Sequence, residues 1–126
     1  MKITVVGSGG WGTALAILLH KNGHQVTVWS YSRSEAEHHE NALLRGVAVP
    51  EEIQLTTEIS AVQDADFVVS AVPSFAVRST AAAMAPYLTK DSIIVSVTKG
   101  IERDTSNRMS QILSEVTGAR VAVLSG

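Results

Sequence analysis

Four glycines lie within six residues near the start of the chain, in the run GSGGWG. Gly7, Gly9 and Gly12 have the spacing G-x-G-x-x-G, after the apolar segment Ile3–Val6 and before a helix-forming segment. In that context the first glycine permits a tight turn and the second lets the backbone approach a pyrophosphate. The third lets the helix pack closely on the first strand. Because a helix N-terminus attracts anions, the run predicts a dinucleotide site. The alternative is a tight strand–helix turn with no ligand.

Trp11 lies inside this glycine run, where a turn of this kind needs no indole. The side chain could pack beside a bound cofactor or form part of a cleft wall. Alternatively, it packs against neighbouring loops as a local core residue. Both interpretations stay open on the sequence alone.

The end of the second expected strand bears on which dinucleotide fits. An Asp or Glu about 20 residues past the glycines would bind the adenosine 2′-hydroxyl, but residues 28–35 read VWSYSRSE, with no carboxylate at the strand end. Ser30, Ser32 and Arg33 could instead surround a 2′-phosphate, with a charge-assisted bond from the arginine. Tyr31 or Arg33 could lie against the adenine. The motif favours NADP(H) over NAD(H), unless Arg33 is simply a solvated residue at a helix start.

Two further strand ends carry candidate groups. After the strand that precedes Ala71, Pro73 would rigidify the turn, Ser74 would cap the next helix and Phe75 could contact the cofactor; capping and core packing alone would also explain this stretch. Lys99 follows an apolar strand and precedes a glycine, so it could hold a substrate phosphate or polarise a carbonyl near the nicotinamide. The competing interpretation of Lys99 is an ordinary surface lysine.

The elements that must position these residues follow from the alternation of short β-branched runs with longer Ala-rich or polar-periodic segments. The predicted strands are Ile3–Val6, Gln25–Trp29, Phe67–Ala71, Ser92–Val97 and Arg120–Leu124, with a weaker one at Gln54–Thr56. The predicted helices are Gly10–Asn22, Ser34–Leu44, Phe75–Leu88 and Thr105–Thr117, with a helical turn over Glu58–Gln63. We therefore expect an α/β, Rossmann-type doubly wound fold, with a mainly parallel sheet and helices on both faces.

Composition narrows the function classes. The 126 residues suffice for one compact domain, and ten Lys plus Arg against twelve Asp plus Glu give no electrostatic argument for a nucleic-acid or membrane partner. The absence of cysteine excludes disulfides and thiolate chemistry, and the histidines have no spacing that suggests a metal site. No run approaches the roughly 18 apolar residues of a membrane span, and the N-terminus lacks a signal-peptide pattern. We expect a soluble, cytoplasmic protein with a small-molecule partner.

The segments GSGGWGTALA, VPS, TKGIE and AVLSG occur in an order and spacing that resembles bacterial-type glycerol-3-phosphate dehydrogenases over the whole chain. Gly7–Ala16 matches that family's G-x-G-x-W-G-T-A-L-A opening. The resemblance implies interconversion of dihydroxyacetone phosphate and sn-glycerol 3-phosphate by hydride transfer with NAD(P)H, which feeds glycerophospholipid synthesis. It also implies cofactor contacts at Gly10, Trp11, Tyr31, Arg33 and Lys99, and substrate contacts at Lys99 and Gly126.

Two departures from the family pattern matter. Gly10 stands where the family often has serine or asparagine, so a side-chain contact would be lost while the backbone N–H remains. The family also carries a helical C-terminal substrate domain with the lysine proposed to donate or accept the proton, and the sequence stops at Gly126. We therefore expect residues 1–126 to be the N-terminal NAD(P)-binding domain of a longer enzyme, a homodimer being compatible with it. The general acid or base would lie beyond Gly126, and this piece alone would be inactive.

Two other functions remain open on the sequence. One is a non-catalytic module that senses NAD(P) and regulates a partner. The other is a different dehydrogenase, such as a β-hydroxyacid dehydrogenase or a ketopantoate reductase. Those enzymes share the glycine turn and a TKG-like strand end but generally lack the Gly-x-Trp-Gly-Thr-Ala-Leu-Ala run.

Overall fold

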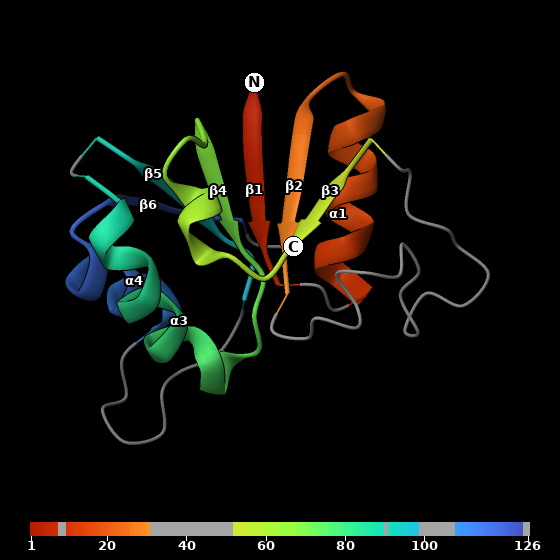
Figure 1. The fold of residues 1–126 in the computed structure, drawn as a ribbon. Helices are drawn as coiled ribbons and strands as arrows, with labels where there is room; N and C mark the ends of the chain where they lie inside the picture. Colours follow the sequence, from red (N-terminus) through yellow and green to blue (C-terminus); the bar gives the residue numbers. More distant parts are fainter. Residues whose placement is uncertain (8–9, 31–51, 90, 99–107, 125–126) are drawn as a thin grey trace.

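The computed structural model describes residues 1–7, 10–30, 52–89, 91–98 and 108–124 (Figure 1). Within these ranges, one sheet of six parallel strands has the order β3-β2-β1-β4-β5-β6. The strands are β1 (Lys2–Val6), β2 (Gln25–Trp29), β3 (Gln54–Thr56), β4 (Phe67–Ser70), β5 (Ile93–Ser96) and β6 (Arg120–Val123). This is the strand order of doubly wound dinucleotide-binding domains, in which the direction of progression reverses between β1 and β4. The predicted fold class is confirmed.

Helices cover the sheet on both faces. The helices are α1 (Gly10–Lys21), α3 (Val77–Met84) and α4 (Met109–Thr117), with 3-10 turns η1 (Ile59–Val62), η2 (Ser74–Ala76) and η3 (Ala85–Tyr87). In Figure 1, α1 lies on one side of the sheet and α3 and α4 lie together on the other. Right-handed crossovers require this arrangement, because the chain moves in opposite directions along the sheet before and after β3.

Apolar residues at successive strand positions build two separate cores. Val5 packs in the α1-side core with Ala16, whereas its neighbour Val6 packs in the core formed with α3 and α4. Val69 and Val68 divide between the two cores in the same way. Because both faces of the sheet are buried at these positions, each strand has consecutive apolar residues there instead of an alternating pattern.

Element boundaries follow the sequence closely, with three corrections. The helix predicted over Thr105–Thr117 begins as α4 at Met109, because Arg108 has an extended backbone at the cap position. The helix predicted over Phe75–Leu88 is divided into η2, α3 and η3. The α-helix α3 ends two residues before Pro86, because proline lacks a backbone N–H. Ser74 does not cap this helix: it is the first residue of η2, Pro73 holds the cap position, and there is no side-chain capping bond. The helix predicted over Ser34–Leu44 lies outside the described residues.

A glycine with a positive φ ends the first helix. Gly23 has a φ of 90° and donates its N–H to the His20 carbonyl at 3.0 Å, which closes the end of α1.

In the described part of the chain, no helix has the length and apolar character needed to cross a membrane.

Candidate functional site

Gly7 closes the carboxyl end of β1 against both neighbouring strands. It has a φ of 124°, and its N–H donates to the Trp29 carbonyl of β2 at 3.0 Å. A Cβ on this residue would lie 2.8 Å from the carbonyl carbon and oxygen of Ala71 and 3.0 Å from the nitrogen of Val72. Both the backbone conformation and this contact with the segment after β4 therefore require glycine.

Gly12 allows the same close packing from the side of the helix. A Cβ there would overlap the carbonyl oxygen of Gly7 and would lie 3.3 Å from the Ala71 Cβ. The first turn of α1 therefore rests directly on the ends of β1 and β4, as expected for the third glycine of the motif. Any side chain at Gly12 would push the helix N-terminus away from this corner.

The N-terminus of α1 is suited to bind an anion. The helix begins at Gly10, beside the point where the strand order reverses, and its 12 residues align their peptide dipoles toward that end. There is no acidic residue in its first turn, whereas His20 and Lys21 occupy the last turn. The N-terminal N–H groups are thus directed at the carboxyl edge of the sheet without a competing carboxylate.

Two large apolar side chains are exposed near this corner. Trp11, in the first turn of α1, is 61% exposed, and Phe75, in η2 after β4, is 89% exposed. Neither is a core residue in this structure, so the core-packing interpretations of both residues are not supported. Exposed aromatic rings at the carboxyl edge of a doubly wound sheet are suited to contact a planar or ribosyl ligand.

The ends of β1, β4 and β5 are held together by hydrogen bonds. The Ala71 N–H donates to the Val6 carbonyl at 2.9 Å, and the Val97 N–H donates to the Ser70 carbonyl at 3.0 Å. One residue further on, the Thr98 Oγ1 donates to the Val72 carbonyl at 2.6 Å. The role of Thr98 is not predicted from the sequence, because a hydroxyl that bonds a residue 26 positions earlier leaves no local signal.

Two buried serines underlie this edge. Ser70 and Ser96 end β4 and β5, face each other in register and are each 1% exposed. Within the described residues, neither hydroxyl has a hydrogen-bond partner. A buried hydroxyl without a partner is unfavourable by about 1–3 kcal/mol, so this pair is a locally unsatisfied region under the strand ends. Neither serine is predicted as a site residue from the sequence, although a serine that ends an otherwise apolar strand is a visible signal.

Ser30 is the one described residue among those predicted to surround a 2′-phosphate after β2. Ser30 is 2% exposed and its N–H donates to the Thr56 carbonyl at 2.9 Å, so this residue is buried and tied to β3. Its hydroxyl is thus not positioned at the surface to meet a phosphate. Tyr31, Ser32 and Arg33 lie outside the described residues.

The structure therefore brings together Gly7, Gly10, Trp11 and Gly12 at the junction of β1, α1 and β4. The other predicted site residues lie outside the described residues: Gly9, Tyr31, Arg33, Lys99 and Gly126. In the part of the chain that is described, no three or more His, Cys, Asp or Glu side chains converge as a metal site would need.

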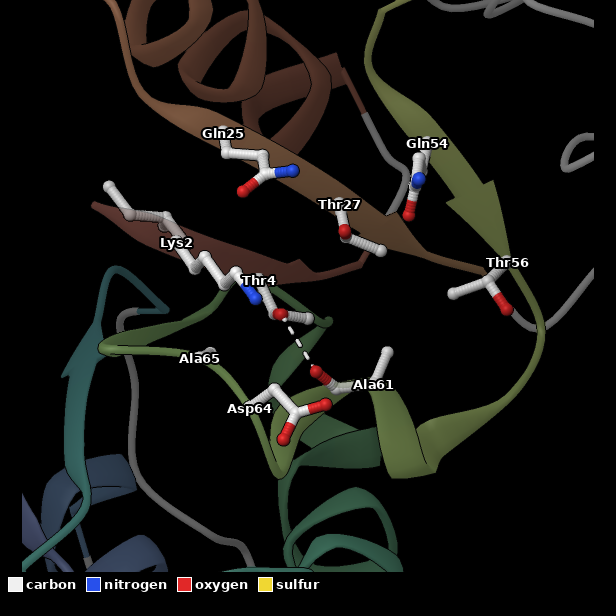
Figure 2. Close-up of a pocket in the computed structure, with 10 residues that line it drawn as sticks. Lys2, Thr4, Gln25, Thr27, Gln54, Thr56, Ala61, Asp64 and Ala65 are labelled. Atoms are coloured by element: carbon white, nitrogen blue, oxygen red, sulfur yellow. Dashed lines mark hydrogen bonds between the residues drawn. The ribbon is translucent and has the colours of Figure 1, made fainter.

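A separate cavity of about 350 Å³ lies away from this corner, on the sheet face opposite α1 (Figure 2). Polar residues at alternate positions of the first three strands form its floor: Lys2 and Thr4, Gln25 and Thr27, Gln54 and Thr56. The Thr4 Oγ1 donates to the Ala61 carbonyl at 3.1 Å, which ties η1 to the wall of the cavity.

The polar floor has a structural explanation. The crossover from β3 to β4 contains only the four-residue η1, which leaves much of this face of β1–β3 to water. Its strands therefore alternate apolar and polar residues, as a half-solvated sheet does. Because dinucleotides bind beyond the carboxyl ends of the strands, this cavity is not the cofactor site.

Gly7 and Gly12, at the junction of β1, β4 and α1, form what we call the glycine corner. The strand order, the glycine corner and the helix that begins beside it define a Rossmann-type dinucleotide-binding domain. A family model described as NAD-dependent glycerol-3-phosphate dehydrogenase N-terminus matches residues 2–126, and the chain belongs to this family. The resemblance drawn from the sequence motifs is confirmed.

Individual relatives agree. Glycerol-3-phosphate dehydrogenase (NAD(P)+) of Fusobacterium nucleatum is 44% identical over the whole chain, which covers 40% of that protein. The enzyme of the same name from Moorella thermoacetica is 45% identical over 99% of the chain, which covers 39% of it. The chain thus spans about two fifths of the length of these relatives.

Solved structures show the same fold. Glycerol-3-phosphate dehydrogenase of Coxiella burnetii superposes with a TM-score of 0.88 at 27% identity, over 99% of this chain and 40% of that one. A ketopantoate reductase of Ralstonia eutropha superposes with a TM-score of 0.78 at 24% identity, over 98% and 40% of the two chains. The second likeness shows the shared fold alone.

Proposed function

We propose that this chain is the N-terminal NAD(P)-binding domain of an enzyme that interconverts dihydroxyacetone phosphate and sn-glycerol 3-phosphate. The observation that carries the proposal is the glycine corner: Gly7 and Gly12 allow the ends of β1, β4 and α1 to meet so closely that no Cβ fits. That contact directs the N-terminus of α1 to the reversal point of the sheet, where a pyrophosphate binds in folds of this kind.

The proposed roles follow from position. Gly7, Gly9, Gly10 and Gly12 would form the turn around the pyrophosphate, and Trp11 would pack beside the cofactor. Tyr31 and Arg33 would contact the adenosine half. Lys99 would contact cofactor and substrate, and Gly126 would contact the substrate.

When bound, the dinucleotide supplies or accepts the hydride, and the residues of this chain bind and orient it. We propose that the group that handles the proton lies beyond Gly126, in a helical substrate domain, and that this chain alone is inactive. The greater length of the relatives supports this division. We further propose that the whole enzyme supplies glycerol phosphate to phospholipid synthesis in the cytoplasm and that homodimers are compatible with its function.

We propose NADP(H) as the preferred cofactor, since no carboxylate stands at the strand end of β2 in the sequence and Arg33 is available to a 2′-phosphate. Titration calorimetry of this chain with NADPH and NADH, at one salt concentration and pH, tests both the site and the preference. Arg33→Ala should weaken NADPH binding by about tenfold, because a charge-assisted hydrogen bond is lost, and should change NADH binding little.

Arg120→Ala is the matched control, because Arg120 is exposed at the start of β6, far along the sheet from β2. It should leave both affinities unchanged. Tighter binding of NADH than NADPH would contradict the cofactor preference alone. Absence of binding by the folded chain would contradict the proposed site. Turnover of dihydroxyacetone phosphate by the longer protein would separate an enzyme from a regulatory sensor of NAD(P).

A further inference from the structure

Thr98 joins the segments that follow β4 and β5 through its side chain. The residue before it is held by the backbone, since the Val97 N–H donates to the Ser70 carbonyl at 3.0 Å. The Thr98 Oγ1 then donates to the Val72 carbonyl at 2.6 Å and lies 3.4 Å from the Ser70 carbonyl oxygen. A side-chain hydroxyl thus bonds backbone carbonyls of the neighbouring segment at the point where the two strands end.

The residue that accepts this bond belongs to the glycine corner. Val72 is 2% exposed, and its nitrogen is one of the atoms that exclude a side chain from Gly7. Its neighbour Ala71 donates to the Val6 carbonyl of β1. The segment Ala71–Val72 is therefore held by β1 on one side and by Thr98 on the other.

This segment lies between the two halves of the dinucleotide site. In doubly wound sheets the adenosine half is bound over the first three strands, and the other nucleotide half is bound over the strands beyond the reversal point. Here those strands are β4, β5 and β6. A bond between the ends of β4 and β5 therefore restrains the segments on which the nicotinamide half would lie. It does not act on β1 and β2, which would bind the adenosine half.

We propose that Thr98 is a positioning residue for the nicotinamide half of the cofactor: its hydroxyl holds the end of β5 against the end of β4. The proposal rests on the function proposed above. A hydroxyl-to-carbonyl bond at 2.6 Å restricts both strand ends before the ligand arrives, so less conformational entropy is lost on binding.

The test compares a whole dinucleotide with the same molecule lacking nicotinamide. This chain is titrated with NADPH and with 2′-phospho-ADP-ribose, or with NADH and ADP-ribose if NADH binds more tightly. Thr98→Val keeps the shape of the side chain and removes the hydroxyl, whereas Thr98→Ser keeps the hydroxyl. We expect Thr98→Val to weaken dinucleotide binding by about fivefold, the value of one hydrogen bond, and to leave fragment binding unchanged. Thr98→Ser should restore dinucleotide binding.

Each other outcome is decisive. Equal weakening of both ligands by Thr98→Val would show a general structural role and overturn the proposal, as would unchanged dinucleotide binding. If Thr98→Val does not fold, as judged by circular dichroism, Thr98→Ala and Thr98→Ser take its place with the same expected contrast. An unaltered chain that is folded and binds neither ligand would overturn the proposed function, and this inference with it.

Discussion

At the scale of single residues, the site depends on two glycines, because these have no side chain. Gly7 and Gly12 bring a strand end, a helix start and the segment after β4 into contact distances that a Cβ would prevent. Glycine is required at the two positions for different reasons. Gly7 has a positive φ as well as too little space for a Cβ, whereas Gly12 is required by space alone. The distinction allows their contributions to be separated by substitution.

Gly12→Ala should lower both stability and cofactor affinity. The new Cβ overlaps the Gly7 carbonyl oxygen, so the start of α1 must shift, at a cost of roughly 1–3 kcal/mol in the free energy of unfolding. The displaced helix N-terminus should bind NADPH about tenfold more weakly, equivalent to ~1.4 kcal/mol. Thermal unfolding and calorimetry measure the two effects.

Gly23→Ala is the control at the other end of the same helix. Its Cβ meets nothing within 4 Å, but its φ of 90° strains an alanine, so it should lower stability by roughly 1 kcal/mol and leave affinity unchanged. If Gly12→Ala retained full affinity, the proposed role of the close packing would be wrong.

At the scale of elements, α1 links the α1-side core to the proposed anion site. Ala16 is fully buried against the sheet, which fixes the axis of the helix, and the first turn carries no acidic residue. Fixing the axis fixes the direction of the N-terminal N–H groups, since these are part of the helix backbone. A negative charge added at this end of α1 should therefore have two opposite effects. It should raise the stability of the helix and lower the affinity for an anionic ligand.

Trp11→Glu tests this response. Trp11 is largely exposed, so the substitution should be tolerated, and a carboxylate near a helix N-terminus stabilises the helix by about 0.3–1 kcal/mol. The same charge should repel a pyrophosphate and weaken binding on the order of tenfold relative to Trp11→Gln, which lacks the charge. Thermal unfolding and calorimetry of both variants give the comparison. Equal affinities for the two variants would exclude an anion at this terminus.

At the scale of the whole molecule, the sheet has two differently covered halves. The half containing β4, β5 and β6 is packed under α3 and α4. Among the residues that the structure describes, η1 alone covers that same face over β1, β2 and β3, beside a polar cavity (Figure 2). The carboxyl edge brings together segments from both halves, so a ligand bound there connects them. Ligand binding should therefore stabilise the chain as one unit.

We expect NADPH at about 100 times its Kd to raise the free energy of unfolding by ~2.7 kcal/mol and the Tm by several degrees. Differential scanning fluorimetry at constant ionic strength measures the shift. Inorganic pyrophosphate at the same concentration is the control and should give a much smaller one. An equal shift with pyrophosphate would indicate an unspecific anion effect in place of a dinucleotide site.

The sequence by itself determined the strands, most helix positions and the glycine turn. The strands Gln25–Trp29 and Gln54–Thr56 have the predicted bounds, and the helix predicted from Gly10 begins there. Apolar runs, glycines and prolines act through neighbouring residues, so their effects can be predicted without knowing the fold. The family motifs added the cofactor class in the same local way.

Only the tertiary structure decided which strand ends meet. The contact of Gly12 with Ala71 and the bond from Thr98 to Val72 join residues far apart in the chain, and both depend on strand order and register. The two buried serines face each other for the same reason. The polar face of β1–β3 likewise follows from the short crossover above it. Such contacts are set by packing of the whole sheet, which no local pattern encodes.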